Sequence, residues 1–145
     1  MSAPSTAELL NRLLAIESRS FPQYLQYSRP HVPPGRTDLM EAIDAIVTDQ
    51  NGLADRVSQM LIESHLPLRT GEFSMEFTDL HDLDISFLIG PAIDYQKQHI
   101  EDLNILVEES QMAPAVKSLA EEALGMAKGH LDTLQELVAE EAKAT

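Results

Sequence analysis

The chain has 145 residues, of which 43% are hydrophobic, and this length and composition suit one domain spanning residues 1–145 with a single core. A formal net charge of −14 repels a phosphate backbone, so nucleic acid is not an expected partner. The chain has no cysteine to bind a metal as thiolate, and no long apolar run or basic leader predicts membrane insertion or export, so we expect a cytoplasmic protein.

The first predicted helix covers about residues 6–27. Ser5 or Thr6 is a suitable N-cap, and Pro22 is expected to kink the helix. Its apolar face, at spacings of three and four, consists of Leu10, Leu13, Leu14, Phe21 and Tyr24. The proline-rich stretch 29–35 then ends the helix.

The second predicted helix covers about residues 38–65, with Thr37 as its cap. Its apolar stripe consists of Leu39, Ile43, Ile46, Leu53, Val57, Met60 and Leu61. Residues 66–79 contain proline, glycine and polar residues without a period, which indicates a crossing loop longer than a helical hairpin needs.

The third predicted helix covers about residues 80–109, kinked at Gly90-Pro91 or beginning afresh at Pro91. The fourth covers about residues 114–141. The inward residues of the third helix are Ile93, Ile100, Leu103, Leu106 and Val107. Together these patterns predict an all-α fold, an antiparallel four-helix bundle with a long crossover between helices two and three.

Every predicted helix carries an ionisable residue in or beside its apolar stripe. In chain order these residues are Glu17, Asp49, Asp94 and His130. Glu17, for example, lies seven residues before Tyr24 and so shares its helix face. His99 is a further candidate ligand, and a small rotation of the second helix would turn Gln50 inward instead of Asp49. Because a buried charge is costly without a partner, this convergence indicates mutual pairing or a shared cation.

The order of the helices and the positions of these residues resemble the ferritin-like superfamily, most closely the bacterioferritins, with a weaker likeness to the Dps proteins. This resemblance covers nearly the whole chain and implies a di-iron site with one Glu from each of helices one and three and a Glu-x-x-His from each of helices two and four. Glu17 stands at the first position and Asp94 at the third. The stretch 49–56 resembles the second-helix motif, and 127–132 resembles the fourth, in which His130 is retained.

Several positions depart from the family pattern. Asp49 replaces a Glu, Gly52 stands where a His belongs, and Ala127 stands where a Glu belongs. Gln50 occupies the position of the haem-ligating methionine, so no haem is expected. The resemblance therefore implies iron or another divalent metal, with a ligand set that suits one cation better than two.

We therefore expect a ferritin-like protein related to iron or metal handling that holds at most one divalent cation, with Glu17, Asp49, Asp94 and His130 as metal ligands and without efficient ferroxidase activity. One alternative is an active di-iron ferroxidase or oxidase whose missing ligands come from His99, Asp55 or a partner chain. Another is a non-catalytic structural or interaction protein, in which His130 is a core histidine hydrogen-bonded to a carboxylate such as Glu17. A homodimer or higher homo-oligomer is expected in each case.

Overall fold

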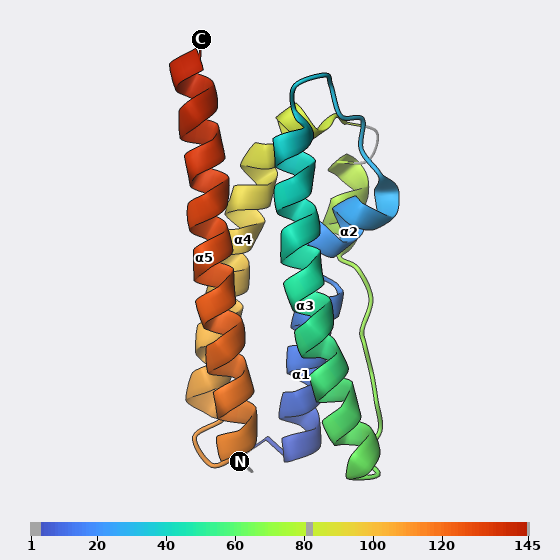
Figure 1. The fold of residues 1–145 in the computed structure, drawn as a ribbon. Coiled ribbons are helices and arrows are strands. Elements are labelled where there is room, and N and C mark those ends of the chain that lie inside the picture. The colour runs from blue at the N-terminus through green and yellow to red at the C-terminus, as the bar shows by residue number, and fades with distance from the viewer. Residues whose placement is uncertain (1–3, 81–82, 145) are drawn as a thin grey trace.

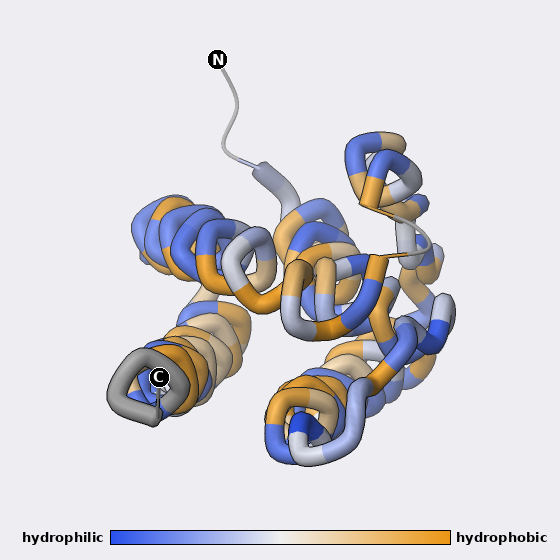
Figure 2. Tube along the Cα trace, turned by 90° about the horizontal axis from the view of Figure 1, so that it is seen from above, coloured by the Kyte–Doolittle hydropathy of each residue, from blue (hydrophilic) through white to orange (hydrophobic). Residues whose placement is uncertain are grey.

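The computed structural model describes residues 4–80 and 83–144, and this part of the chain contains helices and no strand. The helices are α1 (Thr6–Ser18), α2 (Phe21–Ser28), α3 (Thr37–Glu63), the 3₁₀ helix η1 (Met75–Leu80), α4 (Ile85–Glu109) and α5 (Pro114–Ala144). Figure 1 shows α1, α3, α4 and α5 running alongside one another, with α2 beside the upper part of α3. Viewed from above in Figure 2, the helices carry both apolar and hydrophilic positions around their axes. The predicted all-α fold is confirmed.

The predicted first helix is two helices, α1 and α2, rather than one kinked helix. Ser20 is the N-cap of α2, and its hydroxyl accepts a hydrogen bond from the backbone N–H of Gln23. Pro22 then lies in the first turn of α2, where its missing N–H costs nothing. The apolar period continues across the break because Phe21 and Tyr24 are still buried, and this continuity explains why the pattern alone predicts one helix.

The connection between α3 and α4 is not wholly irregular. The long helix α3 matches its predicted bounds closely, although Thr37 is its first residue rather than its cap. The expected loop contains η1, whose Phe77 is buried. The ring of Phe77 lies 5.1 Å from Phe21 and 5.1 Å from Tyr95, measured between centroids. Aromatic packing therefore orders this segment against the bundle.

Helix α4 begins at Ile85, with the Asp84 side chain accepting hydrogen bonds from the first-turn backbone N–H groups. Residues 81 and 82, which the predicted helix included, lie outside the described residues. Pro91 is inside α4 and does not end it. A proline removes one hydrogen bond to the carbonyl four residues earlier, here that of Phe87. Phe87 is an exposed residue.

Two groups of apolar side chains form the core. The lower cluster joins α1, α3, α4 and α5 and includes Leu10, Leu13, Leu53, Val57, Leu103, Leu106, Val116 and Ala120. The upper cluster joins α2, α3, η1, α4 and the later part of α5 and includes Phe21, Leu25, Leu39, Ile43, Phe77, Leu88 and Leu134. Along each long helix, a short interval separates the two clusters, and the candidate site lies in that interval.

Candidate functional site

A layer of polar side chains separates the two apolar clusters. Residues of α1, α3 and α4 and the N-cap of α2 contribute its buried members, and we call the set the polar layer. Its buried members are Glu17, Ser20, Gln50, Gln96 and His99. Along the sequence, Glu17 and Ser20 come after the lower-cluster residues of α1 and before the upper-cluster residues of α2. On α3 and on α4, the other three buried members likewise fall between residues of the two clusters. The apolar clusters above and below therefore hold the layer away from bulk water.

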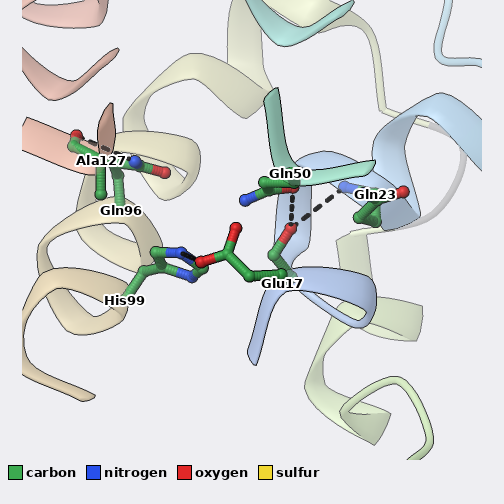
Figure 3. A network of polar contacts seen from close by, with 7 residues as sticks. Glu17, Gln23, Gln50, Gln96, His99 and Ala127 are labelled. Atoms are coloured by element: carbon green, nitrogen blue, oxygen red, sulfur yellow. Dashed lines mark hydrogen bonds and ion pairs between the residues drawn. The ribbon is translucent and has the colours of Figure 1, made fainter. Parts of the chain in front are cut away.

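Glu17 and His99 form the centre of the layer. Their exposed fractions are 2% and 8%, and Glu17 Oε1 lies 3.3 Å from His99 Nε2 (Figure 3). The contact joins α1 to α4 across the bundle. A buried carboxylate is costly without a partner, and a histidine can offer an N–H or a positive charge. The two groups thus compensate each other, at a distance longer than most N–H···O hydrogen bonds.

A second hydrogen-bonded set connects the α1–α2 break to α3. The Ser20 hydroxyl donates to Gln50 Oε1 at 2.8 Å while it also caps α2. Because Gln50 Oε1 faces the hydroxyl, the amide nitrogen of Gln50 points to the other side, toward the carboxylate of Glu17 in Figure 3. The break between α1 and α2 therefore supplies the Ser20 hydroxyl, which orients the side-chain amide of Gln50 in the site.

Gln96 leaves a buried oxygen without a partner. Its Nε2 donates to the carbonyl oxygen of Ala127 on α5 at 3.1 Å. A carbonyl oxygen can only accept, so the amide nitrogen must lie on that side and Oε1 on the other. Gln96 is 1% exposed, and within the described residues its Oε1 has no hydrogen-bond partner. Figure 3 shows this oxygen turned away from Ala127. Such groups are uncommon in folded proteins and call for a bound ligand or water.

Asp49 and His130 form an outer pair between α3 and α5. Asp49 Oδ2 lies 2.6 Å from His130 Nε2. The side chain of Asp49 is 45% exposed and that of His130 is 18% exposed, so the pair lies at the edge of the layer. Both residues nevertheless line the same small cavity as the buried members.

The cavity that joins these groups is very small. Its volume is about 10 Å³, close to the minimum that holds one water molecule. Its walls are Glu17, Ile46, Asp49, Gln50, Gln96, His99, Ala123, Met126, Ala127 and His130. A larger hollow of about 570 Å³ between α1 and residues 67–71 shares no residue with it. The chemistry therefore centres on a site with room for one water or one ion.

Three of the four predicted site residues meet at this cavity. Glu17 is buried as predicted, and Asp49 and His130 line the same space. Asp49 lines the cavity from its edge, with a side chain that is 45% exposed, and its neighbour Gln50 is buried. The burial of Gln50 matches the alternative in which a small rotation of the second helix turns this residue inward.

The prediction that Asp94 lies at the edge of the inward face and joins the site is wrong. Asp94 is exposed on α4 and is not a wall of the cavity. The buried residues of this part of α4 are Ala92, Gln96, His99, Leu103 and Leu106. Their alternating spacings of four and three define the inward face, and Asp94 is out of phase with it. His99, the alternative ligand, is inward.

Sequence reasoning missed Gln96 and Ser20. The available signal for Gln96 was its spacing of three residues from His99, on the face that continues to Leu103. An uncharged amide attracts less notice than a carboxylate, although its oxygen is also a metal ligand. Ser20 could have been found as the cap that a proline two residues later favours.

A two-iron site does not fit these residues. In the described part of the chain, no group of three or more His, Asp or Glu side chains is placed to hold a metal ion. Among the described residues of the polar layer, Glu17 is the only buried carboxylate, and a di-iron site of the ferritin-like kind takes four carboxylates. The donor set that remains, one carboxylate, one imidazole and one unpartnered amide oxygen, suits a single cation.

Comparison with family models, with curated proteins and with solved structures gives no match. No helix among residues 4–80 and 83–144 has the length and apolarity to cross a membrane. The polar layer is therefore the feature of the structure that bears on function.

Proposed function

We propose that the polar layer binds one divalent metal cation, with Glu17, His99 and Gln96 as its protein ligands, and that the protein handles metal without oxidising it. The observation that carries this proposal is the buried, unpartnered Oε1 of Gln96, a residue that lines the same cavity as the Glu17–His99 pair. A cation supplies what this oxygen lacks and also neutralises the buried carboxylate.

The separation of the first two ligands supports the proposal. At 3.3 Å, Glu17 Oε1 and His99 Nε2 are farther apart than an optimal hydrogen bond. Two ligands bound tetrahedrally at about 2.0–2.1 Å from one ion lie about 3.3–3.4 Å from each other. The pair can therefore exchange its mutual contact for a shared ion with little movement.

The donor types narrow the choice of metal. An imidazole nitrogen with carboxylate and amide oxygens suits Zn²⁺, Fe²⁺ or Mn²⁺, whereas Ca²⁺ takes oxygen ligands and Cu⁺ takes sulfur. The net charge of −14 concentrates cations near the surface. We further propose a ferritin-like origin for the chain, on the grounds of its helix order and of Glu17 and His130. Ferroxidase turnover is the less favoured alternative, because in the described part of the chain the polar layer lacks the carboxylates that would bridge two irons.

Equilibrium dialysis of the metal-free protein tests the proposal with Zn²⁺ in air and with Fe²⁺ and Mn²⁺ under nitrogen. We expect one ion per chain for at least one metal and a loss of about tenfold or more in affinity in Glu17→Gln and His99→Asn. The matched control is Asp94→Asn, which removes an exposed carboxylate from the same helix as His99. No binding, or binding that survives both site substitutions, would overturn the proposal.

A second function has one observation in its favour. Each histidine of the site already has a carboxylate partner, Glu17 for His99 and Asp49 for His130. In this alternative the polar layer fixes how the helices pack, as buried polar groups do in some bundles, and a single water occupies the cavity. Dialysis separates the alternatives, because this one predicts no retained metal and a loss of stability in both site variants.

A further inference from the structure

We infer that the cation reaches Glu17 and His99 through a chamber between the α1–α2 break and α4, with Asp102 as the carboxylate that captures it. This inference rests on the proposed cation site and concerns how that site is filled. Neither Asp102 nor the chamber is part of the proposed ligand set.

The chamber lies directly against the polar layer. Its volume is about 110 Å³, against about 10 Å³ for the inner cavity. Its walls are Ile16, Ser20, Phe21, Pro22, Phe77, Tyr95, Gln96, Gln98, His99 and Asp102. Gln96 and His99 are walls of both spaces. The chamber and the inner cavity therefore adjoin at two of the proposed ligands.

A second pair of side chains covers the inner cavity on its α3–α5 side. There the Asp49–His130 contact of 2.6 Å bridges α3 and α5. A hydrogen bond this short between a carboxylate and an imidazole is typical of charge-assisted pairs, which are the stronger ones. Ala123, Met126 and Ala127 of α5 complete that wall with apolar surface. The Asp49–His130 contact and these apolar side chains therefore cover the cavity on its α3–α5 side.

A row of possible ligands runs along α4 from the layer outward. Gln96, His99 and Asp102 follow one another at intervals of three residues, which places neighbours within reach on the helix surface. Their exposure increases in the same order, from 1% for Gln96 and 8% for His99 to half-buried for Asp102. The row offers an ion successive oxygen and nitrogen donors as it loses water.

The charge of the chamber favours a cation. Gln98 donates a hydrogen bond to Asp102 Oδ1 at 3.0 Å, and in the described part of the chain the second oxygen of Asp102 has no partner. Among the described residues, no lysine or arginine lines the chamber. Arg12 lines a neighbouring hollow with Asp102 but is ion-paired with Glu109. The aromatic walls lower the local dielectric constant and strengthen the attraction of the carboxylate for an ion.

Stopped-flow binding of Co²⁺, followed by its visible absorption, tests the route. We expect Asp102→Asn to lower the association rate constant about threefold or more, while Asp94→Asn leaves it unchanged. Ile16→Phe, which fills the chamber, is expected to slow association and dissociation together, with little change in the equilibrium constant. Equal slowing of both rates indicates a blocked route, whereas a damaged site would change the equilibrium constant.

The outcomes distinguish the route from the site. Wild-type rates in both chamber variants, with one Co²⁺ bound per chain, would overturn the route and leave the cation site standing. Faster association in Asp49→Asn, which opens the α3–α5 side, would also overturn it. A wild-type protein that binds no Co²⁺ at equilibrium would overturn the proposed function and the route with it.

Discussion

Replacing Gln96 by leucine tests whether its buried oxygen is unsatisfied when no metal is present. An unsatisfied buried acceptor costs about 1–3 kcal/mol, and the hydrogen bond from Nε2 to Ala127 contributes about 1 kcal/mol. Leucine has a similar size and removes both terms, so Gln96→Leu is expected to stabilise the metal-free protein by about 0–2 kcal/mol. A gain of 1 kcal/mol corresponds to about 2–4 °C in Tm for a chain near this length.

The assay is urea unfolding followed by circular dichroism, with a chelator and then with saturating Zn²⁺. Zn²⁺ is expected to stabilise the wild type and to stabilise Gln96→Leu much less, because one ligand is gone. The exposed Gln135→Leu on α5 is the control and is expected to change stability by less than about 0.5 kcal/mol. Destabilisation of Gln96→Leu by more than about 1 kcal/mol in chelator would refute the reasoning, since it would mean that the oxygen is already satisfied.

Three further predictions concern the surroundings of the site. Ser20→Ala removes the cap of α2 and the partner of Gln50 Oε1, and urea unfolding is expected to show a loss of about 1–3 kcal/mol; a loss below 0.5 kcal/mol would contradict both roles. Phe77→Ala is expected to cost about 3–5 kcal/mol and to make residues 67–80 sensitive to protease, because its ring anchors η1; unchanged proteolysis would show that the segment is held otherwise. Burial and the hydrogen bond to Glu76 raise the pKa of Tyr95 above its ordinary value of 10.0. The unfolded chain then ionises first, so this contribution to the free energy of unfolding is complete below about pH 10 and falls as pH rises through the folded pKa. Tyr95→Phe should therefore lose less stability than the wild type between pH 9 and 11, and parallel curves would contradict the assignment.

Much of the helical framework could be predicted from apolar periodicity. The long helices α3 and α5 lie close to their predicted bounds because their inward stripes are continuous and prolines mark where they begin. The break at Ser20 was missed because Phe21 and Tyr24 keep the period across it. The 3₁₀ helix η1 has no period, and its order comes from contacts of Phe77 with rings distant in sequence.

Predicting the residues of the candidate site required the rotation of each helix about its axis, and apolar periodicity defines this rotation less well than it defines the ends of a helix. Glu17 has apolar neighbours on both sides of its turn, and its burial is as predicted. On α3, neighbouring positions differ by about 100° around the axis, and this one step exchanges Asp49 for Gln50. On α4 the Gly90-Pro91 pair left the phase of the helix open, and Asp94 was chosen for its place at the edge of the apolar stripe and at the position of the third-helix Glu in the ferritin-like pattern. The structure places the amide inward, where a full charge would need a partner.

The most direct test of the cation site is a crystal of the full chain soaked in Zn²⁺, with an anomalous difference map recorded at the zinc edge. A peak about 2.0–2.2 Å from both Glu17 Oε1 and His99 Nε2, and close to Gln96 Oε1, is the predicted result. A peak bound to Asp49 and His130 instead, or a polar layer that contains only water at saturating zinc, would contradict the account.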